Sequence, residues 1–276
     1  MSMEQSMLSL LSGGIVGLSL GLLGGGGSIL AVPFLLYLVR LKNAHVVIGT
    51  SALAVSVNAF FNLFTHARHG HVRWKPAIGF SVPGILGAFL GSELGKRLHG
   101  STLLFLFALL MFVIAGLMLK RAARPAPRIH PAVSGVAENE DGTAALIPIR
   151  VHWGRVVMAG FLVGALSGFF GIGGGFLIVP ALIFAADFSF IEAIGSSLFA
   201  VGVFGLTTAV NYSLAGLINW LAFGEFILGG ALGGILGARL ATRLSQRRAA
   251  LNYIFSAVII AVAFYMLYKN ALVLHL

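Results

Sequence analysis

The chain has 276 residues, of which 58% are hydrophobic and 9% charged, and it contains no cysteine. A soluble domain carries about a quarter of charged residues, so this composition, with a mean hydropathy of +0.99, excludes an ordinary soluble protein and indicates helices in a lipid bilayer. Disulfides, thiolate nucleophiles and cysteine-ligated metals are excluded, and a net charge of +10 spread between apolar runs is typical of cytoplasmic loops rather than of nucleic-acid binding.

Apolar runs fill most of the chain, four before a polar gap and four after it. They cover residues 11–39, 44–65, 76–95, 101–119, 156–186, 192–214, 221–243 and 250–268. This order predicts an all-α, multi-pass integral membrane protein. We expect a first transmembrane repeat over 1–119, a linker over 120–155 and a second transmembrane repeat over 156–276.

The gap at 120–155 is rich in proline, alanine and charge and has no helical or strand periodicity. Such a composition is typical of a flexible linker outside the membrane. It begins with the densest basic cluster of the chain, KRAARPAPR. Because positive charge favours the cytoplasmic side, we expect the linker to be cytoplasmic.

The two halves repeat each other. Segment 17–33 aligns with segment 164–180 through a glycine cluster that is followed by proline. After a one-residue slip, Gly49-Thr50-Ser51 falls on Gly195-Ser196-Ser197, and Trp74 falls on Trp220. Glycines at 84, 87 and 91 then fall on glycines at 230, 233 and 237. Matches over so much of each half predict an internal duplication.

Each half begins with an apolar run that glycines interrupt. The first run is longer than one helix needs to cross the hydrocarbon core, so we expect both glycine segments to break into two short pieces near mid-membrane and to be re-entrant. Paired breaks of this kind indicate a transporter binding site, whose helix starts suit an anion; close helix packing through small residues is the alternative. The candidate binding residues are Gly24, Gly26, Gly27, Ser28, Gly171, Gly173, Gly174 and Gly175, with Pro33 and Pro180 as structural helix breaks.

The next helix of each half carries polar side chains in matching positions. Their helical spacing puts most of them on one face, and we expect them to line a polar cavity, although hydrogen bonding between helices would explain any one of them. Phe204 replaces the residue that matches Asn58. The candidate cavity residues are Thr50, Ser51, Asn58, Asn62, Ser196, Ser197, Thr208 and Asn211.

Four ionisable residues are candidates for coupling or for neutralising an anion. Glu93 and Glu225 lie within apolar runs, where charged groups are functional candidates. Arg239 aligns with Glu93, and His66 ends a helix beside a basic loop that also contains histidines at 69 and 71. The loop is best explained as a solvated surface, so no metal site is expected. Ser19 lies in a G-x-S-x-G pattern without the surrounding fold of a hydrolase, and we expect no catalytic residue and no cofactor.

The duplicated glycine segments that end in Val-Pro, together with the following Gly-Thr-Ser and Gly-Ser-Ser pieces, resemble the sulfite exporter TauE/SafE family, also called the TSUP family. The resemblance implies a permease of the cell's inner membrane that exports small sulfur-containing anions such as sulfite or organosulfonates. An alternating-access secondary transporter is therefore our first hypothesis. An anion channel with a fixed pore and, less favoured, an intramembrane enzyme are the alternatives. Homo-oligomerisation remains open.

The distribution of lysine and arginine bears on the orientation of the two halves. If each glycine-broken segment enters and leaves on one side, positive charge concentrates on the linker side much more than if every run crosses once. An odd number of full spans then remains in each half. The sequence therefore predicts inverted repeats, with the loop at 68–75 cytoplasmic and its counterpart near Gly216 external.

Overall fold

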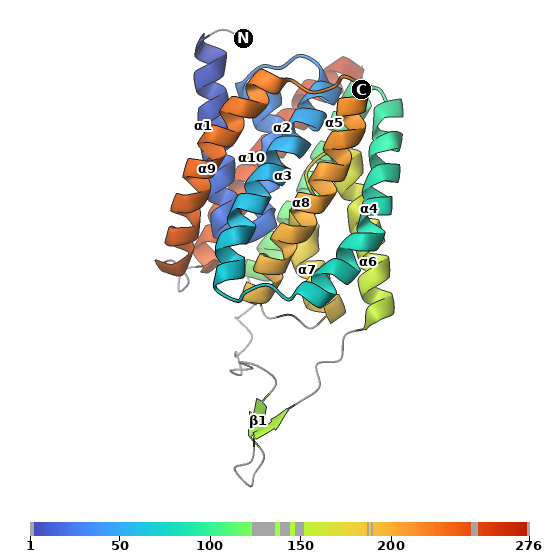
Figure 1. Ribbon diagram of the computed structural model, residues 1–276. Helices are drawn as coiled ribbons and strands as arrows, with labels where there is room; N and C mark the ends of the chain where they lie inside the picture. Colours follow the sequence, from blue (N-terminus) through green and yellow to red (C-terminus); the bar gives the residue numbers. More distant parts are fainter. Residues whose placement is uncertain are drawn as a thin grey trace.

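Long helices form nearly all of the computed structural model (Figure 1), which describes residues 3–122, 136–138, 144–146, 152–186, 188, 190–243 and 248–274. Seven helices of this described part are long and apolar enough to cross a membrane. The first half contains α1 (Met3–Leu23), the 3₁₀ segment η1 (Gly24–Leu30), α2 (Ala31–Pro33), the π-helical segment η2 (Phe34–Leu38), α3 (Ala44–Arg68), α4 (Trp74–Arg97) and α5 (Gly100–Ala122). The second half contains α6 (Trp153–Phe170), α7 (Gly175–Ala186), α8 (Phe190–Leu214), α9 (Trp220–Arg243) and α10 (Arg248–Leu274).

The glycines interrupt the first run of each half as expected, but the pieces before the breaks are not short. Helix α1 starts at Met3 and has 21 residues, and α6 has 18. Both reach the length of a membrane span. The first eight residues of α1 contain neither glycine nor proline, so nothing prevents the helix from starting well before the apolar run. Only the pieces after the breaks are short, and α7 has 12 residues.

The segment between the halves contains a small antiparallel ribbon. Strand β1 (Val136–Glu138) pairs with β2 (Ala144–Leu146), with Val136 opposite Leu146 and Glu138 opposite Ala144. This pairing was not expected from the composition. Helix α5 continues to Ala122 and α6 begins at Trp153. The division into two transmembrane repeats and a linker stays a prediction.

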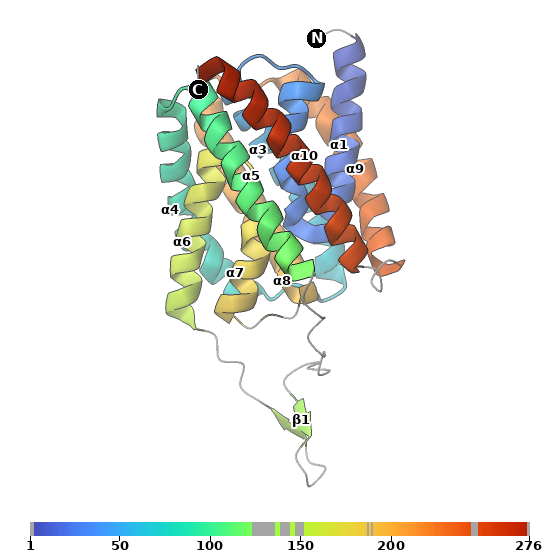
Figure 2. The same cartoon turned by 180° about the vertical axis from the view of Figure 1, so that it is seen from behind.

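Helices of the two halves alternate in the bundle. Helix α1 packs against α9, α4 against α6, α3 against α8, and α5 against α10. Figure 2 shows α5 and α10 side by side on one face, and Figure 1 shows α3 and α8 side by side on the opposite face. Each half therefore contributes one helix to every main contact, and neither half forms a separate bundle.

The two ends of the bundle are distinguished by the connections that lie there. The β ribbon and the α3–α4 connection lie at one end (Figure 1). The start of α1, the connection from η2 to α3, the α8–α9 connection and the end of α10 lie at the other. In the first half, the glycine-broken segment thus starts and finishes at the end away from the ribbon. In the second half, α6 starts and α7 finishes at the ribbon end.

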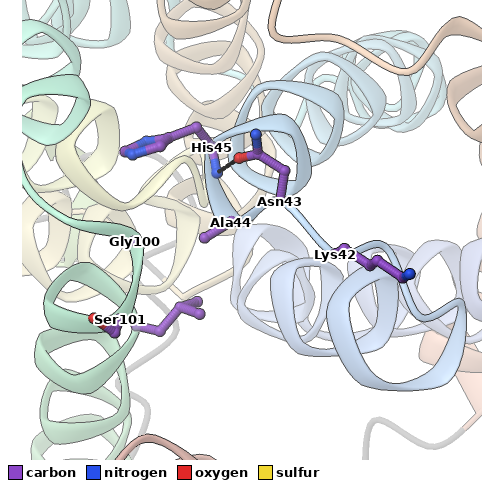
Figure 3. Close-up of a pocket in the computed structure, with 7 residues that line it drawn as sticks. Lys42, Asn43, Ala44, His45, Gly100 and Ser101 are labelled. Atoms are coloured by element: carbon purple, nitrogen blue, oxygen red, sulfur yellow. Dashed lines mark hydrogen bonds between the residues drawn. The ribbon is translucent and has the colours of Figure 1, made fainter. Parts of the chain in front are cut away.

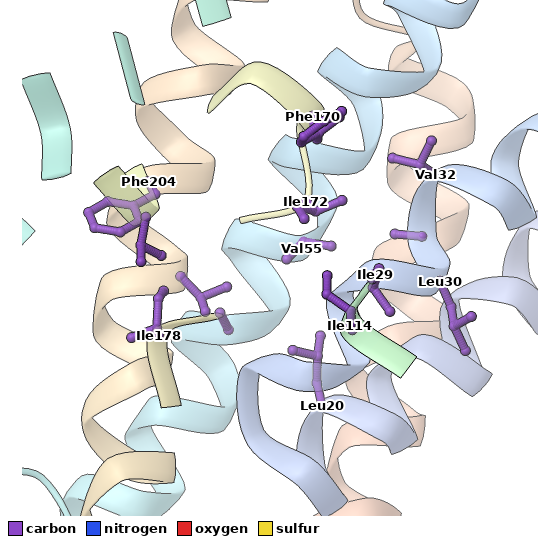
Figure 4. Close-up of a cluster of buried hydrophobic side chains, with 14 of the residues drawn as sticks. Leu20, Ile29, Leu30, Val32, Val55, Ile114, Phe170, Ile172, Ile178 and Phe204 are labelled. Atoms are coloured by element: carbon purple, nitrogen blue, oxygen red, sulfur yellow. The ribbon is translucent and has the colours of Figure 1, made fainter. Parts of the chain in front are cut away.

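The core surrounds the two broken segments. Figure 4 shows Val55 between Ile29 and Leu30 on one side and Ile178 and Phe204 on the other, and these side chains are at most 2% exposed. Large apolar side chains also cover the outside of the helices, as in Leu86 at 64% and Leu232 at 64% exposure. Because a soluble protein rarely exposes so much continuous apolar surface, this outer surface is explained by contact with lipid.

A candidate site at the second glycine break

The second break is a tight left-handed turn between α6 and α7. Gly171 ends α6 with φ +67°, and Gly173 and Gly174 both have φ +66°. Residues other than glycine rarely adopt this conformation. The backbone of this turn therefore requires glycine at the three positions. A Cβ at Gly173 would lie 2.9 Å from Val201 Cγ1 and 3.1 Å from Val55 Cγ1. The turn is thus held between α8 and α3.

The first break has a different backbone conformation. Gly24 to Leu30, which includes Gly26, forms 3₁₀ turns, and α2 then leads through Pro33 into η2. Gly27 and Ser28 are buried, and a Cβ at Gly27 would lie 2.5 Å from the backbone nitrogen of Leu20. The two aligned segments therefore do not form identical half-sites. In the second break, Gly175 begins α7 and Pro180 lies inside it.

Ser51 links α3 to the second break. Its hydroxyl oxygen lies 3.0 Å from the carbonyl oxygen of Ile48 and 3.2 Å from that of Gly171, and its one proton is shared between these two acceptors. The candidate from the first half therefore contacts the candidate from the second half directly. The contact joins a polar side chain of one half to the irregular backbone of the other and satisfies that backbone inside the protein, as irregular backbone at membrane depth requires.

The remaining hydroxyl candidates already have partners. Thr50 Oγ1 accepts a hydrogen bond from the backbone N–H of Asn219 at 2.9 Å, and Ser196 Oγ accepts one from the backbone N–H of Arg73 at 3.0 Å. Ser197 and Thr208 donate to carbonyl oxygens of their own helix, Ile194 and Phe204. These contacts connect helix ends or satisfy the hydroxyls locally, and the expected cavity remains a prediction. All of these hydroxyl-bearing residues are fully buried.

Asn58 is the exception among the buried candidates. Its side chain is fully buried, and neither its Oδ1 nor its Nδ2 has a hydrogen-bond partner. Asn62, one turn further along α3, donates from Nδ2 to the backbone oxygen of Asn58 at 2.9 Å. A Cβ at Gly230 would meet the amide of Asn58, and one at Gly234 would lie 2.8 Å from Asn62 Nδ2. Both amides therefore face α9.

The charged candidates lie apart from one another. Glu93 Oε2 is 2.9 Å from Lys96 Nζ, so this carboxylate is paired. Arg239 is exposed near the end of α9. Glu225, on α9, has a buried Oε2 without a hydrogen-bond partner. His66 is half-buried with its ring 5.9 Å from that of His71, and the described residues contain no cluster that could hold a metal.

Sequence reasoning missed the network around Asn211. Its Nδ2 donates to Ser92 Oγ at 2.7 Å and to Glu93 Oε2 at 3.4 Å, while Lys96 Nζ donates to its Oδ1 at 2.8 Å. The network joins α4 to α8. The spacing of Glu93 and Lys96 was the only available signal, because nothing local connects either residue with Asn211.

A surface pocket of about 430 Å³ lies at the start of α3 and α5. Figure 3 shows Asn43, whose side-chain oxygen accepts the backbone N–H of His45 at 2.9 Å, with Ser101 on the neighbouring helix and Lys42 extending away. The two helix N-termini and Lys42 make its potential positive. None of the candidate binding residues lines it.

The structure defines a multi-pass helical membrane protein with a buried, irregular polar centre, the class to which many transporters belong. The chain belongs to the sulfite exporter TauE/SafE family, whose model matches residues 9–266. It is 50% identical over 271 residues to a "probable membrane transporter protein" of Xylella fastidiosa strain Temecula1, covering 98% of each chain. It is also 28% identical to the "probable membrane transporter protein YunE" of Bacillus subtilis, over 72% of this chain and 75% of that one. No solved structure matches it.

Proposed function

We propose that this chain is a secondary transporter that exports small sulfur-containing anions, such as sulfite or organosulfonates, across the inner membrane. The observation that carries the proposal is the contact between Ser51 and Gly171, where a buried hydroxyl of one half meets the irregular backbone of the other. Irregular backbone at membrane depth is tolerated where it lines a site. The family's name suggests the sulfur anion, and export follows the same name.

Alternating access requires two parts that can rock against each other around the site. We infer that the halves are inverted repeats and that they supply these parts. The support is that matching glycines make matching contacts. A Cβ at Gly17 would meet the carbonyl of Gly230, and one at Gly164 would meet the carbonyl of Gly84. The broken segments also start at opposite ends of the bundle.

Two loop glycines test the inverted arrangement. Gly70 and Gly216 align in the repeat and have φ +70°, and a Cβ at either position would have no atom within 4 Å. A cysteine therefore has space at both, and the positive φ costs it about 1–2 kcal/mol at each. In the otherwise cysteine-free chain, Gly70→Cys should react with a membrane-impermeant maleimide from the cytoplasm and Gly216→Cys from outside. Labelling of both from one side would contradict inversion. Gln246, at which the sequence also predicts a cytoplasmic position, lies outside the described residues.

Uptake into proteoliposomes tests the transport proposal. Purified protein should move sulfite or an organosulfonate in a saturable manner and show counterflow, while sulfate and carboxylates should be moved much more slowly. Protein-free liposomes are the control. Flux that does not saturate and lacks counterflow would favour a fixed-pore channel, and chemical conversion of the anion would favour an enzyme. Absence of flux for every sulfur anion would refute the proposal.

A further inference from the structure

Two aligned positions, Asn58 and Phe204, have opposite chemistry in the same packing environment. Both side chains are fully buried. A Cβ at Gly230 of α9 would meet the amide of Asn58, and a Cβ at Gly84 of α4 would meet the ring of Phe204. Each residue therefore fills the space that a glycine leaves on the helix opposite. One contact is polar and the other is apolar.

The apolar contact, at Phe204, is formed entirely by protein side chains. The ring of Phe204 stacks on that of Phe80, with centroids 6.0 Å apart and the planes at 27°. The residue that aligns with Phe80 is Phe226, which is also fully buried. An apolar residue at position 58 would therefore find matching apolar surroundings. The surroundings alone do not account for an asparagine there.

The amide of Asn58 is unpaired at a place where this is unfavourable. Both of its polar atoms are buried without a partner, and burying an amide in this way costs stability. The facing surface of α9 is formed by Gly230 and Gly234, which have no side chains to bond with it. A ligand between α3 and α9 would satisfy the amide.

Polar side chains stabilise the contact between α4 and α8 at both of its ends. Lys96 and Glu93 of α4 hold Asn211 of α8 at one end. At the other end, Arg73 Nε is 3.9 Å from Glu192 Oε1, and the residue preceding α4 thereby meets the start of α8. The α4–α8 contact is therefore closed by hydrogen bonds and opposite charges.

The α3–α9 contact has different residues at the aligned positions. The residues that align with Glu93, Lys96 and Asn211 are Arg239, Thr242 and Thr65, and none of them is acidic. Asn219 and Val46 align with Arg73 and Glu192, so the second ion pair has no counterpart either. The hydrogen bond from the Asn219 backbone to Thr50 does span this contact. Opening the α3–α9 contact consequently breaks no counterpart of the Glu93–Lys96–Asn211 network or of the Arg73–Glu192 pair.

We propose that the amide of Asn58 is a polar subsite for the transported anion, and that the anion reaches it when the contact between α3 and α9 opens. An amide Nδ2 donates hydrogen bonds to the oxygens of a small oxyanion without fixing a charge in the membrane. Asn62 lies beside it. The aligned position at Phe204 is a closed apolar contact and binds no second anion. This inference rests on the proposed transport function.

The test compares Asn58→Leu with Phe204→Leu. Leucine has the same number of side-chain heavy atoms as asparagine, branches at the same Cγ and removes the unpaired amide, so Asn58→Leu should fold with a thermal midpoint equal to or above that of the wild type. Its uptake of sulfite into proteoliposomes should fall at least tenfold. Phe204→Leu removes part of a buried ring and should lower the midpoint, but its uptake per folded protein should stay within about threefold of wild type.

The outcomes separate the two proposals. Wild-type uptake by Asn58→Leu, or a midpoint several degrees below wild type, would overturn the subsite and leave transport standing, because Asn58 would then be a packing residue. Equal loss of uptake in both variants would overturn the inference that only position 58, and not position 204, binds the anion. If the wild type moves none of sulfite, organosulfonates and sulfate, the transport proposal fails, and the subsite fails with it.

Discussion

Replacing Gly233 with leucine should prevent α1 from packing against α9 and should remove most of the folded protein from the membrane. A Cβ at Gly233 would overlap the carbonyl oxygen of Gly14, which belongs to backbone and cannot move aside as a side chain does. Gly229 and Gly237 make the same type of contact with Leu10 and Leu18. The helices would have to separate along their whole contact. We expect a loss of at least about 3 kcal/mol, the upper end for overpacking.

Gly224→Leu is the matched control, because Gly224 lies on the same helix and a Cβ there has no atom within 4 Å. Both variants add the same apolar surface, so only the backbone contact differs. The measurement is the yield of monodisperse protein on size exclusion in mild detergent, followed by its thermal midpoint. Gly233→Leu with the yield and midpoint of Gly224→Leu would show that α1 and α9 do not pack closely.

The glycine pattern illustrates what can be predicted from the sequence. The spacing of Gly84, Gly87 and Gly91, and its repetition in the second half, identifies helix faces that suit close packing. It does not identify the helix that packs on each face, because the lipid-facing and the packed faces of a membrane helix are both apolar. The exchange of partners, with α1 against α9 and α6 against α4, is a tertiary property that only the structure provides.

The polar candidates show a similar limit. Helical spacing puts Ser51, Asn58, Asn62 and Thr65 on one face of α3; the first three are buried, whereas Thr65 is exposed. Spacing cannot predict whether a hydroxyl turns back to its own helix, as Thr208 does, since that bond needs no partner helix. It also cannot predict the pairing of Lys96 with Asn211, because these residues are far apart in the chain. The unpaired amide of Asn58 follows from glycines on another helix.

Replacing Gly174 with leucine should abolish transport, because the change acts on the second break itself. Gly174 has φ +66°, which costs a residue with a Cβ about 1–2 kcal/mol, and the new Cβ would lie 2.8 Å from Ser167 Cβ. The turn must rearrange, and Gly171, whose carbonyl oxygen accepts the hydroxyl of Ser51, lies three residues earlier in it. We expect sulfite uptake to fall by at least two orders of magnitude, since small displacements at a binding centre have large effects on rate.

The loss should exceed any loss of stability, because the turn lies between α6 and α7 and the glycine contacts of α6 with α4 come from residues 160, 164 and 168. Those contacts remain in Gly174→Leu, so the variant should still insert, although with a lower thermal midpoint. Gly154→Leu is the matched control: Gly154 lies at the start of α6, the helix that leads into the turn, and a Cβ there meets nothing within 4 Å. The comparison is uptake per folded protein. Uptake by folded Gly174→Leu equal to that of Gly154→Leu would mean that the left-handed turn is a packing feature, and the transport site would then have to lie elsewhere between the halves.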